Sequence, residues 1–91
     1  MSQYDWHPAK AEANRRRHGV TFEEADDVVA NPDARWAVDA AHSEFDERMR
    51  VIGWSPLARL IVVVVSTAGP RPRIISARRA TKRERDAYTD R

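Results

Sequence analysis

The chain has 91 residues, of which 42% are hydrophobic and 33% are charged. This length suits one hydrophobic core rather than two, and the composition is that of a globular chain. Cysteine is absent, which excludes a disulfide scaffold, a cysteine nucleophile and a thiolate metal site. The longest apolar run, Leu60–Val65, is far shorter than the roughly 20 residues of a membrane-spanning helix. The N-terminus lacks an apolar signal core, so we expect one cytoplasmic domain over residues 1–91.

Charge is distributed unevenly along the chain, although the formal net charge is only +2. Residues 22–50 carry nine acidic and three basic side chains, whereas residues 71–91 carry eight basic and three acidic ones. A basic end beside an acidic middle indicates a polyanionic partner and a second, basic partner. A mixed, solvated surface explains the same distribution equally well.

The N-terminal third predicts two helices joined by a tight corner. A proline precedes the first helix, Ala9–Arg17, and Gly19 is placed to end it in the left-handed conformation. Thr21 and Glu24 have the spacing of a capping box, which predicts the start of a second helix over Phe22–Ala30. An Asn-Pro pair then stops that helix.

The rest of the chain predicts four strands and a last helix. The third strand contains the run LIVVVV, which is typical of a strand buried on both faces. A second capping-box pattern, Thr81 and Glu84, opens a helix that extends to about Asp90. Short turns between consecutive strands favour an antiparallel meander with helices on one face, so the fold class is α+β. The expected strands are Arg35–Ala41, Glu47–Trp54, Arg59–Thr67 and Arg71–Arg78.

Three segments of the chain resemble the BrnT family. They are WHPAK…N…HG-V-x-F-E-E-A, then H-S-E-x-x-E-R, and finally R-I-I-S-A-R-x-A-x-x-x-E-R-x-x-Y, the most specific of the three. The resemblance extends from Trp6 to Tyr88 and implies a compact fold similar to RelE toxins. One position departs from the family, which usually has aspartate where this chain has His7. Aspartate is a good helix N-cap, so we expect His7 to cap less well, with either more fraying of the first helix or Asp5 taking part of the capping.

The resemblance implies the toxin of a type II toxin–antitoxin pair, a ribonuclease that cleaves messenger RNA and inhibits translation. It implies attack by the ribose 2′-hydroxyl without a metal ion or other cofactor. The implied partner is a BrnA-like antitoxin with a ribbon-helix-helix segment, in a possible heterotetramer. That antitoxin would provide the only contact with operator DNA, and no membrane partner is implied. The alternative is a non-catalytic RNA-binding or co-repressor module that acts only with its antitoxin.

Cationic side chains are the first candidates for the site, because phosphate and its transition state need guanidinium or ammonium donors. Arg78 and Arg79 end the fourth strand just before a helix, where free N–H groups also favour phosphate. Being adjacent, they point to opposite faces of the sheet. The family pattern selects Arg78 and Arg73 and, on the first helix, Lys10. The structural alternative for Arg78 is an ion pair with Glu84.

Residues able to transfer a proton are the second group of candidates. His18 ends the first helix, where the cation is favoured; this suits a general acid, although a capping role explains it too. Glu84 and Tyr88 are four residues apart and share a helix face, either for chemistry or for packing.

Arg48 matches the family's Glu-Arg pair and is expected on the open side of the sheet. The predicted catalytic residues are Lys10, His18, Arg48, Arg78 and Glu84, and the predicted RNA-binding residues are Arg73, Arg79 and Tyr88.

No residue spacing in the sequence indicates a metal site, because His7, His18 and His42 match no zinc pattern. The three glycines do not form a phosphate-binding loop either. Trp6, Trp36 and Trp54 are expected in the core or at an interface, with base stacking as the alternative.

Overall fold

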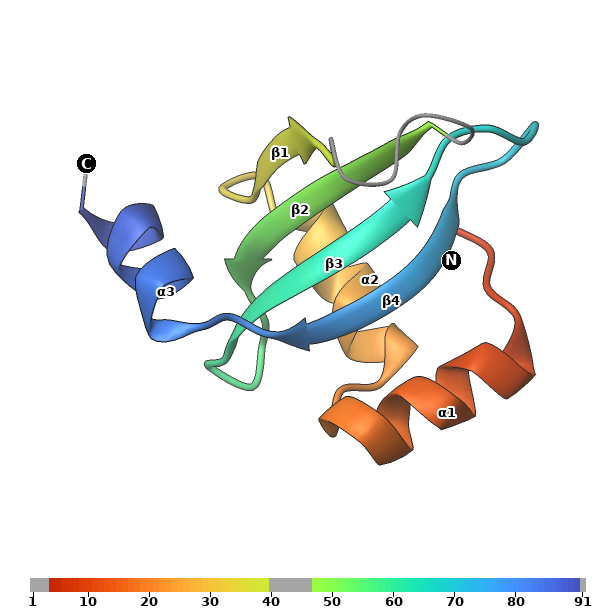
Figure 1. Cartoon of the computed structure of the whole chain (residues 1–91), viewed down its shortest axis with the longest axis horizontal. Helices are drawn as coiled ribbons and strands as arrows, with labels where there is room; N and C mark the ends of the chain where they lie inside the picture. Colours follow the sequence, from red (N-terminus) through yellow and green to blue (C-terminus); the bar gives the residue numbers. More distant parts are fainter. Residues whose placement is uncertain (1–3, 40–46, 91) are drawn as a thin grey trace.

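The computed structural model describes residues 4–39 and 47–90, with three helices and a four-stranded antiparallel sheet (Figure 1). The strand order β1-β2-β3-β4 follows the chain, so the predicted meander and the α+β class are confirmed. Residues 40 and 41, expected at the end of the first strand, and His42 lie outside the described residues. The elements are α1 (Pro8–His18), α2 (Phe22–Ala30), β1 (Arg35–Val38), β2 (Arg48–Trp54), β3 (Leu60–Ser66), β4 (Arg73–Arg79) and α3 (Lys82–Thr89).

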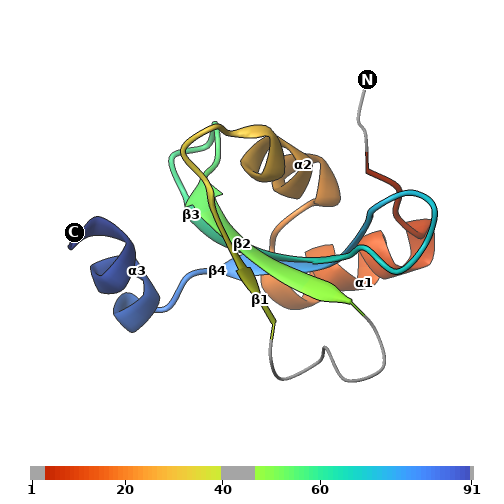
Figure 2. The same cartoon turned by 90° about the horizontal axis from the view of Figure 1, so that it is seen from above.

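One face of the sheet, called the inner face, packs against α2, while α1 lies along β4 (Figures 1 and 2). The core forms where alternate residues of the central strands meet the apolar side of α2. Five of the seven β3 residues, Leu60 to Val63 and Val65, are at most 2% exposed, so the predicted burial of this strand on both faces is confirmed. Trp6 packs edge-on against Phe22. Trp36 and Trp54 are 42% and 38% exposed, so of the two places expected for the tryptophans, core or interface, these two do not lie in the core.

The opposite face of the sheet, called the outer face, is organised in three rows of cross-strand neighbours. Rows on one face are two residues apart, which separates them by roughly 7 Å along the strands. An irregularity between Val64 and Val65 adjusts the pairing of β4 with β3. The rows are Arg48–Ser66–Arg73, then Arg50–Val64–Ser76, then Ile52–Val62–Arg78.

The termini of α1 show what the histidine at the family's aspartate position does. Nδ1 of His7 accepts the N–H of Ala9 at 3.2 Å, so His7 is itself the N-cap. Asp5 does not share this role, and that expectation was wrong: its backbone bonds to β4 and its carboxylate lies 3.4 Å from Arg71. At the other end, Gly19 has φ of 70° and ends the helix as predicted.

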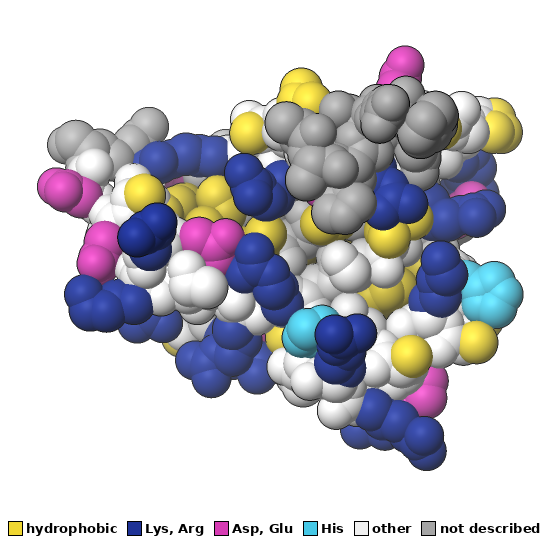
Figure 3. Space-filling model, viewed as in Figure 1, with side chains coloured by type: hydrophobic (Ala, Val, Ile, Leu, Met, Phe, Trp, Pro, Cys, Tyr) yellow, Lys and Arg dark blue, Asp and Glu magenta, His cyan; other side chains and the backbone are white. Residues whose placement is uncertain are grey.

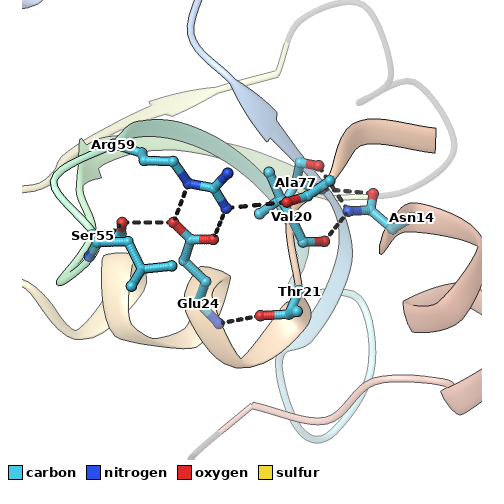
Figure 4. A network of polar contacts seen from close by, with 9 residues as sticks. Asn14, Val20, Thr21, Glu24, Ser55, Arg59 and Ala77 are labelled. Atoms are coloured by element: carbon cyan, nitrogen blue, oxygen red, sulfur yellow. Dashed lines mark hydrogen bonds and ion pairs between the residues drawn. The ribbon is translucent and has the colours of Figure 1, made fainter. Parts of the chain in front are cut away.

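The capping box predicted for α2 forms only in part. The Thr21 hydroxyl accepts the N–H of Glu24 at 3.0 Å, but the Glu24 carboxylate turns away from the cap (Figure 4). It accepts instead from the Ser55 hydroxyl at 2.6 Å and from the Arg59 guanidinium, whose Nε lies 3.0 Å away. These hydrogen bonds from Arg59 and Ser55 keep the pKa of the buried Glu24 carboxyl below its usual value. Arg59 also bonds the carbonyl of Gly19, so one network joins the α1–α2 corner to the β2–β3 turn.

Asn14 fastens α1 to the free edge of β4. Its Nδ2 donates to the carbonyls of Val20 and Ala77 at 2.9 and 2.8 Å, and its Oδ1 accepts the N–H of Ala77 at 3.0 Å. The side chain is buried, so every one of these bonds is shielded from water. Asp5 covers the same edge nearer its start by pairing its backbone with Pro72 and Ile74. The edge strand is therefore covered by the N-terminal segment rather than by another strand.

Helix α3 differs from the other two because none of its residues is buried. It begins with the predicted capping box, in which Thr81 and Glu84 bond one another's backbone N–H groups at 3.1 and 2.8 Å. The helix projects beyond the end of the sheet (Figure 2) and is joined to it by polar side chains, described below. Among residues 4–39 and 47–90, no helix is long and apolar enough to span a membrane.

Candidate functional site

The outer face carries basic side chains across its surface (Figure 3), and two cavities open onto it. The more polar one, called the basic pocket, lies between α1, the start of β2 and the β3–β4 turn, and has a volume of about 430 Å³. Three residues predicted separately from the sequence meet here, Lys10 from α1, Arg48 from β2 and Arg73 from β4. The full lining is Asp5, Lys10, Arg48, Ser66, Ala68, Gly69, Pro70, Arg71, Arg73 and Ile75.

Positive charge dominates the basic pocket. Its four cationic side chains face one carboxylate, that of Asp5, which lies near Arg71. Among the described residues, the side chains of Lys10 and Arg73 have no hydrogen-bonding or ionic partner. Donors left unpaired in a concave basic surface are suited to an anion such as a phosphodiester.

The second cavity, called the α3 groove, lies where α3 approaches the other end of the outer face and has a volume of about 390 Å³. Glu84 and Tyr88, which the sequence placed on one helix face, both line it. Arg50 enters it from the middle row of the sheet. The full lining is Arg35, Trp36, Ala37, Arg50, Ile52, Val62, Glu84, Ala87 and Tyr88.

Arg78 lines neither cavity, but it forms a bidentate ion pair with Glu84, which lines the α3 groove. Nη1 and Nη2 of Arg78 lie 2.8 and 2.9 Å from the two carboxylate oxygens of Glu84. The Arg78 hydrogen bonds, aided by the backbone N–H of Thr81, lower the pKa of Glu84 to about 2. A carboxyl with this pKa is ionised near neutral pH and holds no proton to donate. The structure therefore contains the ion pair with Glu84 that was the structural alternative for Arg78. Through this pair Glu84 anchors α3 to β4.

Tyr88 anchors the far end of α3 to β1. Its hydroxyl donates to the carbonyl of Asp33 at 3.0 Å, and the Arg35 guanidinium lies 4.5 Å from the centre of its ring. Arg35 also donates to the backbone carbonyl of Tyr88. Tyr88 thus packs α3 against β1, which was the structural alternative for this residue. Tyr88 also lines the α3 groove, so a ligand bound there can contact it.

Two predicted residues lie away from both cavities. His18 is exposed at the C-terminus of α1, eight residues or about 12 Å along the helix from Lys10. Arg79 points to the opposite side of the sheet from Arg78, as their adjacency predicted, and its charge acts on Glu24. Neither residue lines the basic pocket or the α3 groove.

The structure adds four charged residues that the sequence analysis did not select. Asp5 and Arg71 line the basic pocket, and Arg35 and Arg50 line the α3 groove. A signal existed for Arg50, because it is two residues from Arg48 in a strand and must share its face. No comparable pattern identifies Asp5 or Arg71, which reach the pocket through the pairing of the N-terminal segment with β4.

Comparison with known proteins gives the family. Residues 6–84 match the family model described as the ribonuclease toxin, BrnT, of type II toxin–antitoxin systems. The chain belongs to the BrnT family. It is thus a ribonuclease toxin of a type II toxin–antitoxin system, with an antitoxin as partner. The BrnT region covers both cavities except for Asp5 of the basic pocket and Ala87 and Tyr88 of the α3 groove.

A solved structure of the same family supports the fold. The 1.1 Å crystal structure of the Brucella abortus ribonuclease toxin BrnT superposes on 90% of this chain and on all of its own, with a TM-score of 0.67 and 21% sequence identity. No curated protein matches the chain. At this identity the likeness to the Brucella protein concerns the fold, so the roles of individual residues depend on the geometry described above.

Proposed function

We propose that this BrnT chain is an endoribonuclease that cleaves messenger RNA at the basic pocket without a metal ion, and so inhibits translation. The observation that carries the proposal is the meeting of Lys10, Arg48 and Arg73 in one cavity. These residues come from three elements and were each selected from the sequence for phosphate binding. Among the described residues, this cluster has four cations and one carboxylate, a charge balance that suits a phosphodiester and its more highly charged transition state.

The proposed reaction is attack of a ribose 2′-hydroxyl on the adjacent phosphorus. The hydroxyl loses its proton to a base, the new O–P bond forms, and the bond to the 5′ oxygen of the next nucleotide breaks. That oxygen takes up a proton, which leaves a 2′,3′-cyclic phosphate and a 5′-hydroxyl. Lys10, Arg48 and Arg73 would stabilise the charge on phosphorus. Asp5, the one carboxylate of the pocket, is placed to accept the 2′-hydroxyl proton.

The other predicted residues receive different roles in this proposal. Arg78 positions Glu84 and contacts the RNA, while Tyr88 contacts it in the α3 groove. Because His18 and Arg79 line neither cavity, the proposal gives them no role at the reacting phosphate. The proposed antitoxin is BrnA-like, uses a ribbon-helix-helix segment for operator DNA, and covers the basic pocket in a heterotetramer. Translation inhibition places the substrate in the cytoplasm.

End-labelled RNA incubated with purified protein in EDTA tests the proposed activity. We expect fragments with 2′,3′-cyclic phosphate ends. Lys10→Ala should lower kcat/KM by roughly 10²–10³-fold, as is typical when one transition-state donor is removed. Asp5→Asn should lower kcat strongly while RNA binding persists. Lys82→Ala is the matched control, since Lys82 is exposed on α3 and, within the part of the chain that the structure describes, pairs only with Asp86.

Three outcomes would contradict the proposal. Cleavage only after a divalent metal is added would refute the metal-free mechanism. Equal losses in Lys10→Ala and Lys82→Ala would show that general charge, not the pocket, matters. RNA that is bound but stays intact, both free and on ribosomes, would favour the alternative function, a non-catalytic module that acts with its antitoxin.

A further inference from the structure

The α3 groove differs in character from the basic pocket, although both open onto the outer face. Its floor is apolar and comes from Ile52 and Val62 of the sheet and Ala87 of α3. Three charged side chains also line the groove: Arg35, which lies against the Tyr88 ring, and Arg50 and Glu84, which have opposite charges. Figure 3 shows the apolar surface beside α3, bordered by basic side chains. An apolar slot with a few convergent polar groups is typical of a site for a small planar ligand.

We infer that the α3 groove is a subsite for one unpaired nucleobase of the RNA, and that the base it selects is guanine. This inference rests on the proposed function, since it takes the RNA to lie along the outer face. The row that lines the basic pocket and the row of Ile52 and Val62 in the groove are two steps apart, or roughly 13 Å, and Arg50 enters the groove from the row between them. An RNA strand whose phosphate occupies the basic pocket therefore places a nearby base at the groove.

The size and walls of the groove suit a single base. Its volume of about 390 Å³ is near the lower end of the roughly 300–1,000 Å³ usual for ligand sites. Tyr88 supplies an aromatic wall, and its ring is held in place by Arg35 and by the hydrogen bond to Asp33. Proteins that recognise single-stranded RNA hold splayed-out bases on such aromatic surfaces.

The polar groups of the groove match guanine. Among the described residues, the Arg50 guanidinium has no partner, so its donors remain for a ligand. Guanine offers two adjacent acceptors, O6 and N7, that an arginine fork fits. Its other edge carries N–H donors, for which Glu84 is the acceptor. A carboxylate has about four acceptor positions, and Arg78 and Thr81 use three of those of Glu84.

The Arg78–Glu84 pair makes this acceptor rigid. Two hydrogen bonds from Arg78 and one from Thr81 fix the orientation of the Glu84 carboxylate. Its remaining acceptor position therefore points in a fixed direction before a base binds. Adenine carries an amino group where guanine carries O6. This amino group is a hydrogen-bond donor, so it cannot accept from the Arg50 guanidinium. The inference thus gives Arg78 a positioning role in base selection, through Glu84.

The first test measures binding of short oligonucleotides that cannot be cleaved because hydrogen replaces each 2′-hydroxyl. A set that differs in one base is titrated by fluorescence anisotropy. We expect the guanine member to bind about tenfold more tightly than the others. Ala87→Phe fills the groove without removing a polar group and should abolish this preference. Ala30→Phe, on the exposed end of α2, is the matched control and should retain it. Arg50→Lys keeps the charge but lacks the fork, so the preference should fall.

The second test maps cleavage sites by sequencing the ends formed on a mixed RNA. Guanine at a fixed position near the cut in wild type and Ala30→Phe, but not in Ala87→Phe, would support the inference. Cleavage without base preference, preference for another base, or preference unchanged by Ala87→Phe would overturn it while the proposed function stands. Guanine-selective binding with no cleavage would support the subsite and contradict the proposed activity.

Discussion

Asn14 joins α1 to the sheet through three buried hydrogen bonds, so its replacement tests how the basic pocket is held together. Asn14→Leu removes the bonds and leaves three backbone groups, the carbonyls of Val20 and Ala77 and the N–H of Ala77, without partners. A typical bond contributes about 1 kcal/mol net, and an unsatisfied buried group costs about 1–3 kcal/mol. We expect the free energy of unfolding to fall by about 3 kcal/mol.

Asn14→Asp is the sharper variant because it keeps the shape of the side chain. At pH 7 the carboxylate still accepts from Ala77 N–H, but it also faces the carbonyl oxygens of Val20 and Ala77, to which Asn14 donates at 2.9 and 2.8 Å. We expect a loss of at least about 3 kcal/mol at pH 7. The loss should shrink at lower pH, where the protonated carboxyl regains one donor.

Urea unfolding followed by tryptophan fluorescence at pH 7 and pH 5 measures both effects. Asn31→Asp is the matched control, because the half-buried Asn31 donates one solvent-exposed bond to the carbonyl of Trp54 at 3.1 Å. It should cost less than about 1 kcal/mol. A loss at Asn14→Asp no larger than at Asn31→Asp, or one independent of pH, would refute the assignment of the Asn14 hydrogen bonds.

Two further predictions concern the other helices. Glu84→Gln should lower the free energy of unfolding. The change of the Glu84 pKa from 4.5 to about 2 sets an upper limit of about 3 kcal/mol for this loss. Solvent screening at the Arg78 side chain, which is 38% exposed, reduces the expected loss to about 1–2 kcal/mol. Because this pKa is lowered in the folded state, the wild-type advantage should be full above pH 4.5 and fade as pH falls towards 2; urea midpoints that differ equally at all pH values would contradict the ion pair. His7→Asp restores the family's residue at the α1 N-cap and should raise stability by about 0.5–1 kcal/mol, seen as a higher Tm, whereas an unchanged Tm would show that His7 caps as well as aspartate.

The order of elements was predictable because each carries a local signal. Gly19 marks the end of α1, and the LIVVVV run marks β3, so these features do not depend on tertiary contacts. The capping box at Thr81 also formed as predicted, since both its partners are local. The one at Thr21 formed only in part because Glu24 bonds Ser55 and Arg59, more than thirty residues away. Sequence spacing cannot reveal such a competitor.

The site was predictable as a set of residue types but not as an arrangement. Lys10, Arg48 and Arg73 were selected one by one, and only the packing of α1 along β4 shows that they share a cavity. The same packing leaves His18 at the far end of the helix. The sequence did not predict the α3 groove, because the groove depends on the direction in which α3 leaves the sheet. None of the α3 residues is buried, so no apolar pattern in the sequence indicates that direction.

The basic pocket draws its cations from both ends of the chain. Lys10 stands 63 residues before Arg73, and the Asn14–Ala77 bonds that bring their elements together cover the same separation. A polypeptide that stops before β4 therefore has no complete pocket, however well its first helices form. During synthesis, the protein becomes able to bind a phosphodiester there only after β4 has emerged from the ribosome. The late arrival of β4 therefore delays the appearance of the toxin's proposed activity until α1 has this strand to pack against.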